Sequence, residues 1–243
     1  MKHIIVLILL AILPLHEIRA QYNTNRLIIS GQSALYYEDY VLSIQYFNQA
    51  LAAKPYLYEP WFYRGLAKFY LDDYTGSEAD VTKAIELNPY VFNMFELRGL
   101  CRIRQKHYAQ AIDDYTRSIN LNPQNQTAWY NRALCRIEDK DYVQAQLDLD
   151  TVITRWKSYA SAYSLKAQVY LLQADTLTAD KWLDKSLQVA PYDVDAWNMR
   201  GMIALSRAEW KNADTYLSKV IHLKPKNAAN YVNRALARYN TNN

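Results

Sequence analysis

The spacing of the prolines limits the fold of this chain more than any other feature. Five of its seven prolines lie on a grid with a step of 34 residues: Pro55, Pro89, Pro123, Pro191 and Pro225. Lys157 stands at the one grid point without a proline. With the grid point taken as position 32, the chain divides without insertion or deletion into units at residues 24–57, 58–91, 92–125, 126–159, 160–193 and 194–227, and a half unit at 228–243. A fixed period of this length predicts stacked repeats.

Side-chain size follows the same period. Position 4 is large in every unit: Leu27, Trp61, Phe95, Trp129, Tyr163, Trp197 and Tyr231. Position 8 is small: Gly31, Gly65, Gly99, Ala133, Ala167, Gly201 and Ala235. Positions 4, 8 and 11 share one helix face, and positions 17, 20, 24 and 27 share another. The pattern predicts two antiparallel helices per unit, ended by the proline. We expect the large residues at position 4 to dominate stability, above all Trp61, Phe95, Trp129 and Trp197.

Three segments carry a family resemblance: WFYRGLAKFYLDDY, WYNRALCRIEDKDY and AIDDYTRSINLNP. On these motifs the chain resembles the tetratricopeptide repeat over residues 24–243. The resemblance implies an all-α fold, a right-handed α-solenoid of stacked antiparallel helical hairpins with six units and one extra helix. It also implies that the chain binds partner proteins or peptides in a concave groove. Because Thr176 and Lys157 depart from the family pattern, we expect the fifth unit to pack more loosely.

Charged residues recur inside the hairpins. Position 7 is basic in units two to six and in the half unit: Arg64, Arg98, Arg132, Lys166, Arg200 and Arg234. Among the six full units, only units two to four have a second base at position 11, and only these units have aspartate at position 23: Asp80, Asp114 and Asp148. Because the carboxylate accompanies the second cation, we predict that each aspartate bridges the two cations of its own hairpin. The alternative is an arginine ladder that binds an anionic polymer.

Residues with catalytic or metal-binding chemistry are scarce. His107 and His222 are far apart, and neither has another His or Cys at metal-ligand spacing. Glycine-rich phosphate loops and nucleophile-elbow motifs are missing from the sequence. We therefore expect no catalytic residues, metal or cofactor, and a protein that is not an enzyme. A net charge of +4 gives no electrostatic reason to expect a nucleic-acid partner.

The two cysteines, Cys101 and Cys135, both occupy position 10 of their units. Equivalent positions on stacked helices lie about 8–10 Å apart, which is beyond disulfide reach. We predict two free, buried thiols, with a regulatory disulfide as the alternative.

The first twenty residues have the pattern of a secretory signal peptide. Lys2 is followed by an apolar run over 4–15, and Ala20 is the small residue that signal peptidases prefer. An apolar run of this length is far shorter than the roughly 20 residues that cross a bilayer. We predict a signal peptide at 1–20 and a repeat domain at 21–243, exported to the periplasm or envelope without a transmembrane segment after cleavage. A retained membrane anchor is the alternative.

The resemblance also implies where a ligand binds. In the family the concave groove is lined by positions 2, 5, 6, 9, 12 and 13 of each first helix, and we call this surface the groove face. On it the candidate binding residues are Glu59, Phe62, Tyr63, Leu66, Phe69, Tyr70, Glu96, Arg104, Tyr130, Asn131, Ser164 and Asn198. Their apolar, tyrosine-rich character suits a peptide with bulky side chains. Alternatively, positions 9 and 12 pack between neighbouring hairpins.

Three functions are consistent with the sequence. The first is a non-enzymatic scaffold or adaptor that binds a partner peptide or protein within the bacterial envelope. The second is a periplasmic module that binds glycan or cell-wall peptide, with tyrosines as stacking surfaces. The third is the regulatory repeat arm of a longer enzyme.

Overall fold

The computed structural model describes residues 23–241, which are helical apart from short turns. The predicted signal peptide therefore lies outside the described residues. A first helix covers residues 23–36. It is followed by α2 (Tyr40–Ala53), α3 (Tyr58–Tyr70), α4 (Tyr74–Leu87), α5 (Phe92–Arg104), α6 (Tyr108–Leu121), α7 (Gln126–Glu138), α8 (Tyr142–Arg155), α9 (Ala160–Leu172), α10 (Thr176–Val189), α11 (Val194–Ser206), α12 (Trp210–Leu223) and α13 (Ala228–Asn240).

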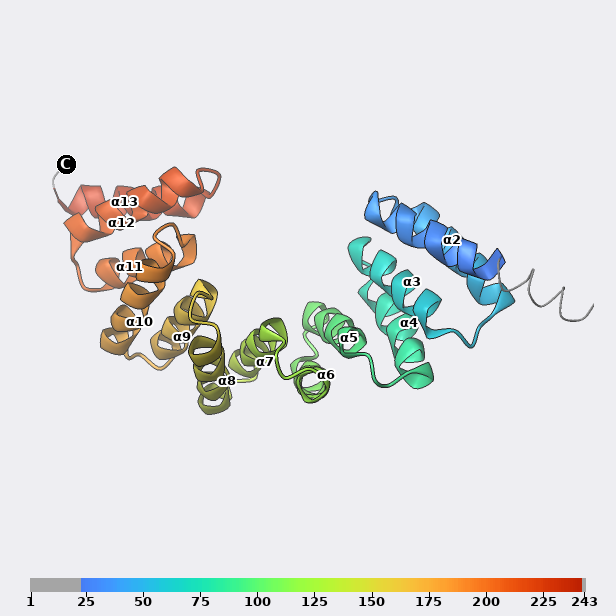
Figure 1. Ribbon diagram of the computed structural model, residues 1–243. Coiled ribbons are helices and arrows are strands. Elements are labelled where there is room, and N and C mark those ends of the chain that lie inside the picture. Colours follow the sequence, from blue (N-terminus) through green and yellow to red (C-terminus); the bar gives the residue numbers. More distant parts are fainter. Residues whose placement is uncertain (1–22, 242–243) are drawn as a thin grey trace, which may run out of the picture. The chain divides into compact units, whose positions relative to one another are not determined.

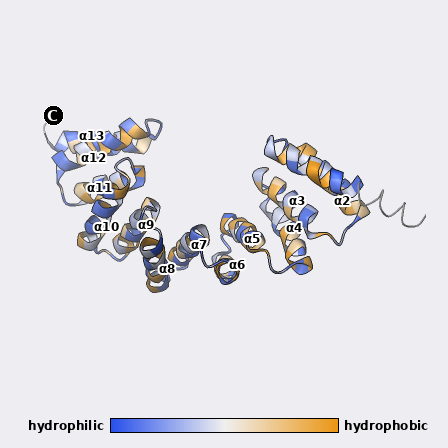
Figure 2. Cartoon of the chain, in the orientation of Figure 1, coloured by the Kyte–Doolittle hydropathy of each residue, from blue (hydrophilic) through white to orange (hydrophobic). Residues whose placement is uncertain are grey.

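Each of the six full units is one helical hairpin, so the all-α solenoid that the family resemblance implies is confirmed. Within each half of the chain, consecutive helices lie side by side and alternate in direction (Figure 1). Orange and blue residues occur together along the helices, as expected when one face of each is buried (Figure 2). The chain forms two compact halves; the first ends at Asn125, the second begins at Gln126, and each is described separately below.

The turn within each hairpin has the same backbone geometry in all six units. Position 15 has a left-handed backbone with φ between 57° and 64°, yet it is never glycine: Glu38, Asp72, Lys106, Lys140, Ala174 and Ala208. The following amide donates back to the carbonyl at position 11, as in the bond from Asp141 N to Arg136 O of 2.8 Å. This arrangement is a Schellman motif. In four units an aspartate at position 16 then caps the second helix, as Asp141 does for α8.

The second helix of every unit ends two residues before the grid point. This holds in unit four as well, where α8 ends at Arg155 although Lys157 replaces the proline. There the amide of Trp156 donates to Val152 O at 2.8 Å, and the partly buried indole packs against the core of the second half. Proline therefore marks the end of the helix but is not required for it. The fifth unit, expected to pack more loosely, has helices of the same length as the others.

The centre of each hairpin is the residue at position 24. This side chain is fully buried in every unit: Phe47, Val81, Tyr115, Leu149, Leu183 and Leu217. Where position 8 is glycine, the position-24 side chain lies directly over it. A Cβ atom added at Gly65 would lie 2.8 Å from Val81, and one at Gly201 would lie 2.8 Å from Leu217. In these units, position 8 is glycine because the position-24 side chain occupies the space that a Cβ would need.

The large residues at position 4 differ in burial, and their expected dominance of the stability stays a prediction. Phe95 is buried, but Trp61, Trp129 and Trp197 are only partly buried. Their role includes a polar link between units, because Nε1 of Trp61 donates to the carbonyl of Pro55 at 2.9 Å. Trp197 makes the equivalent bond to Pro191 at 2.8 Å. These rings join each unit to the grid-point residue of the unit before it, while position 24 fills the core.

The predicted charge bridges are confirmed in all three hairpins. Asp80 lies 2.6 Å from Arg64 and 2.8 Å from Lys68. Asp114 bridges Arg98 and Arg102 at 2.7 and 2.8 Å, and Asp148 bridges Arg132 and Arg136 at 2.7 and 2.6 Å. All three carboxylates are buried. In these units the cations are paired with the protein's own carboxylates. This pairing argues against the alternative of an arginine ladder that binds an anionic polymer.

Position 7 also reaches back to position 25 of the preceding unit. Arg64 Nη1 donates to Asn48 Oδ1 at 2.7 Å, and Arg98 Nη1 donates to Thr82 Oγ1 at 3.3 Å. In the later units this contact is an ion pair, between Lys166 and Asp150 and between Arg200 and Asp184. The basic residue at position 7 thus connects the two helices of its hairpin in units two to four, and neighbouring hairpins in both halves.

The two thiols are free and buried, as predicted. Cys101 Sγ lies 3.1 Å from Ser77 Oγ, within hydrogen-bonding distance. Burial disfavours the charged thiolate, and it raises the pKa of Cys101 to about 11 and that of Cys135 to about 12.

Candidate functional site

Each half of the chain has a cavity on its groove face. In the first half, a pocket of about 500 Å³ lies between the first helix, α2 and α3, and we call it the tyrosine pocket: its lining is Gln32, Leu35, Tyr36, Glu38, Tyr40, Tyr63, Leu66 and Tyr70. In the second half, a pocket of about 340 Å³ lies across α7, α9 and α11, and we call it the polar pocket: its lining is Tyr130, Ser164, Leu165, Gln168, Leu171, Asp195, Asn198 and Met199.

Stacked aromatic rings give the tyrosine pocket its shape. Tyr40 stacks on Tyr70 with ring centroids 5.1 Å apart, and Tyr63 stacks on Phe47 at 5.9 Å. Tyr36 and Tyr70 remain open to solvent, with 82% and 54% of their surface exposed. Exposed aromatic rings beside a cavity are the surface features that most often anchor a partner side chain.

The polar pocket combines a buried phenol with hydroxyl, amide and carboxylate groups. Tyr130 packs edge-on against Tyr159 at 5.3 Å. Burial raises the pKa of Tyr130 to about 12, with smaller contributions from Tyr159 and the nearby carboxylates. Ser164 Oγ donates to the carbonyl of Ser161 at 3.2 Å. Asp195 is exposed, so the lining offers hydrogen-bonding groups together with one negative charge.

Six of the twelve predicted residues line these cavities: Tyr63, Leu66, Tyr70, Tyr130, Ser164 and Asn198. Phe62 and Phe69 instead pack against the core formed by Val81, Met94 and Leu97. Phe69, at position 12, thus packs between hairpins, as the alternative for that position predicts. Phe62 shows that a residue at position 5 can do the same.

The other four predicted residues lie outside both pockets. Glu96 is partly buried and accepts a hydrogen bond from Asn125 Nδ2 at 2.7 Å, and burial raises the pKa of its carboxyl. Arg104 is exposed, with its guanidinium 5.9 Å from the ring centre of Tyr74. Glu59 and Asn131 are partly exposed residues of α3 and α7.

The predicted set also misses several lining residues. Gln32, Leu35 and Tyr36 occupy positions 9, 12 and 13 of unit one. The same rule applied to units five and six would have found the rest of the polar pocket: Leu165, Gln168, Leu171, Asp195 and Met199. Only Glu38 and Tyr40 lie outside the groove-face positions, because Glu38 belongs to the turn and Tyr40 to the second helix.

Within residues 23–241, no group of three or more His, Cys, Asp or Glu side chains could hold a metal ion. In the same part of the chain, no helix is both long and apolar enough to cross a membrane.

The chain is thus built of tandem helical hairpins, and its first helices form most of the lining of these two cavities. The family model of the tetratricopeptide repeat matches residues 98–147. Comparison with curated proteins gives no match.

Solved structures with a similar fold cover more of the chain than the family model does. PilF of Pseudomonas aeruginosa has a TM-score of 0.70 at 14% identity, covering 90% of this chain and 98% of that one. A tetratricopeptide-repeat protein from Parabacteroides merdae has a TM-score of 0.66 at 16% identity, covering 88% and 84%. YrrB, described as a TPR protein with an unusual peptide-binding site, has a TM-score of 0.66 at 15% identity, covering 71% and 89%. The chain therefore shares the fold of these tetratricopeptide-repeat proteins, and its repeat motif matches the family model over residues 98–147.

Proposed function

We propose that the chain is a non-enzymatic scaffold or adaptor that binds an extended segment of a partner protein on its groove face, within the bacterial envelope. One observation carries this proposal: both halves have a cavity, and groove-face positions of successive first helices form most of the lining of each. A surface that recurs at fixed positions suits a ligand that runs along several repeats.

The two cavities favour different parts of such a ligand. The tyrosine pocket has open rings and a single carboxylate in its lining, which suits a bulky apolar side chain. The polar pocket presents hydroxyl and amide groups that can bond to peptide N–H and C=O groups. The likeness to YrrB in fold, a TPR protein with an unusual peptide-binding site, supports a peptide ligand.

The envelope location rests on residues 1–20, with Lys2, the apolar run and Ala20. The full-length protein, expressed in a bacterium, should be recovered from the periplasmic or envelope fraction. Its mass should be that of a chain beginning near Gln21. Recovery of the uncleaved chain from the cytosol would exclude export.

The groove-face proposal is tested by affinity capture from envelope extract followed by mass spectrometry. The variant Tyr36→Ala/Tyr70→Ala removes the two open rings of the tyrosine pocket, and both are exposed enough to leave the core intact. The matched control is Tyr56→Ala/Tyr90→Ala, which removes two tyrosines of the same half that are 63% and 75% exposed and lie outside the pocket.

A protein captured by the parent and by the control, but lost from the pocket variant, would support the proposal. The same bands from all three proteins would contradict it. The exposed tyrosines also suit the stacking of sugar rings. If the parent is retained on purified cell-wall material and the pocket variant is not, the glycan-binding alternative replaces the scaffold.

A further inference from the structure

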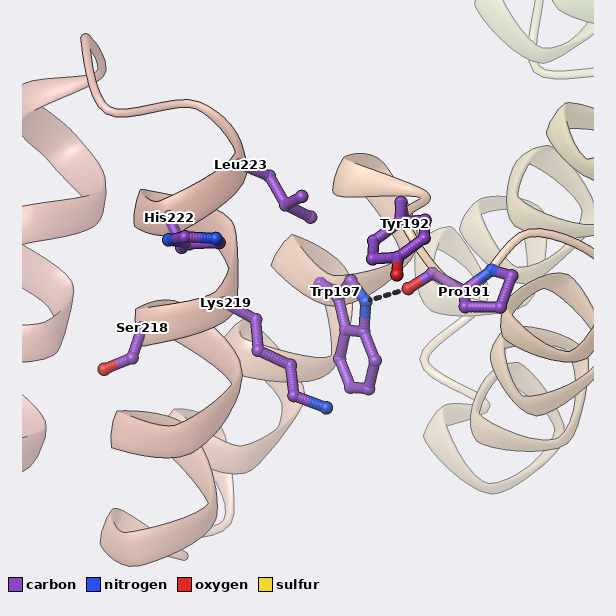
Figure 3. Close-up of a pocket in the computed structure, with 7 residues that line it drawn as sticks. All are labelled: Pro191, Tyr192, Trp197, Ser218, Lys219, His222 and Leu223. Atoms are coloured by element: carbon purple, nitrogen blue, oxygen red, sulfur yellow. Dashed lines mark hydrogen bonds between the residues drawn. The ribbon is translucent and has the colours of Figure 1, made fainter.

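A third cavity lies away from the groove face, in unit six of the second half. We call it the unit-six pocket; its volume is about 490 Å³ and its lining is Pro191, Tyr192, Trp197, Ser218, Lys219, His222 and Leu223. In Figure 3 the indole of Trp197 lies between the Pro191–Tyr192 segment and α12, and Lys219 and Leu223 extend toward it from the helix. The lining positions are 4, 25, 26, 29, 30, 32 and 33, and none of them belongs to the groove face.

The wall of this pocket is mostly apolar, and its charged groups are basic. Trp197 is held in place by the bond from its Nε1 to Pro191 O at 2.8 Å. Lys219 Nζ lies 3.8 Å from the centre of the Trp197 ring, a cation–π contact that holds the ammonium over the aromatic surface. Within residues 23–241, Lys219 forms no ion pair. His222 follows one turn later on the same helix.

The neighbouring carboxylates are engaged elsewhere. Asp193 accepts hydrogen bonds from Ser186 Oγ at 2.7 Å and from the amides of Asp195 and Ala196, which begin α11. Asp214, on α12, is paired with Arg238 at 2.9 Å. The unit-six pocket therefore presents an unneutralised ammonium beside an apolar wall.

Unit two provides a comparison within the same chain. Its equivalent residues are nearly identical: Pro55, Tyr56, Trp61, Thr82, Lys83, Glu86 and Leu87. There too the indole donates to the proline carbonyl, at 2.9 Å. The main difference is position 29, where Glu86 takes the place of His222 and pairs with Lys83 at 2.8 Å. The same surface thus has a neutralised lysine in unit two and a lysine without a carboxylate in unit six.

We propose that the unit-six pocket binds a small planar apolar molecule with one anionic group, such as an aromatic carboxylate or sulfonate. Trp197, Tyr192 and Leu223 cover the ring system, and Lys219 pairs with the anion at the edge of the pocket, with His222 beside it. The volume lies in the usual range of small-molecule sites. A basic residue in the last turn, here His222, also favours α12 through its helix dipole, so the experiment measures binding and helix stability separately.

The test uses two fluorescent probes with similar rings: anilinonaphthalene sulfonate, which is anionic, and phenylnaphthylamine, which is not. The protein should bind the sulfonate more tightly. The variant His222→Glu copies unit two, and it should weaken sulfonate binding about three- to tenfold while leaving the uncharged probe unchanged. Lys219→Met keeps the apolar stem and should abolish the preference for the anion. In the reverse exchange, Glu86→His should create a second sulfonate site.

Two controls protect the interpretation. Tyr90→Ala removes an exposed tyrosine that lines none of the three pockets, and it should leave sulfonate binding unchanged. Circular dichroism should show equal helicity for all variants. Unchanged sulfonate affinity in His222→Glu would overturn the proposal. Equal loss of both probes in Lys219→Met would also overturn it, because the pocket would then bind apolar molecules without regard to charge.

Discussion

Asp148 shows how single charged residues determine the packing of a hairpin. Its buried carboxylate accepts two bonds from Arg132, at 2.9 and 2.7 Å, and one from Arg136 at 2.6 Å. Replacing it by Asn in Asp148→Asn removes the negative charge and leaves two partly buried cations without a counter-ion. We expect a loss of about 3–5 kcal/mol in the free energy of unfolding, measured by urea denaturation.

The chain itself offers the control for this prediction. Unit six has alanine at position 11 and tyrosine at position 23, and Arg200 there lies 5.7 Å from the ring centre of Tyr216. The variant Arg136→Ala/Asp148→Tyr copies that arrangement into unit four and removes one charge of each sign. This double variant should lower the free energy of unfolding clearly less than Asp148→Asn does. Equal losses would show that the aspartate contributes through its shape and not through its charge.

The cysteines give a residue-scale prediction about reactivity. Only the thiolate reacts with disulfide reagents, and burial holds the pKa of Cys101 at about 11 and that of Cys135 at about 12. Because the folded-state pKa values are raised, both thiols stay protonated at pH 8. We expect almost no reaction with a thiol reagent in the native protein and two equivalents after unfolding in guanidinium. Fast labelling of the native protein would contradict the buried positions.

At the scale of elements, the left-handed backbone at position 15 strains each hairpin turn, and a substitution by glycine can relieve this strain. Ala208 has φ of 57° and is exposed, so its side chain gains no burial in return for the left-handed backbone. Glycine adopts this conformation without strain. Ala208→Gly should therefore raise the free energy of unfolding by about 0.5–1 kcal/mol.

The control for this prediction is an alanine-to-glycine change in an ordinary helical residue. Ala79 is exposed inside α4, where Ala79→Gly should lower the free energy of unfolding by about 1 kcal/mol. Denaturation of both variants under the same conditions gives the comparison. Destabilisation by both substitutions would show that the turn gains nothing from glycine.

The sequence is sufficient to predict the helices, because proline, the small residues and the aromatic residues recur with one period. It does not reveal the central role of position 24, where the residue varies from Val81 to Tyr115 and so shows no regular size. The groove face is predicted in part for a related reason. Phe62 and Tyr63 are adjacent on one helix, and periodicity alone cannot decide which ring packs inward and which lines a pocket.

At the scale of the whole molecule, the contacts follow the order of the chain. In both halves, helices touch their sequence neighbours, and first helices of adjacent units also touch, as α3 touches α5 and α9 touches α11. In such an array, stability is approximately the sum of the stabilities of the units and of the contacts between neighbouring units. A local defect should therefore open the chain locally before it opens elsewhere.

Leu217→Ala tests this linear behaviour. Leu217 is fully buried against Gly201, and its loss leaves a cavity that should cost about 2–5 kcal/mol. We expect faster hydrogen exchange in α11, α12 and α13 and unchanged exchange in α3, α4 and α5, measured by mass spectrometry of peptide fragments. The matching variant Val81→Ala should show the reverse, since Val81 holds the same position in unit two. If both variants accelerate exchange equally in all helices, the chain unfolds as one cooperative unit, and the nearest-neighbour description of its stability fails.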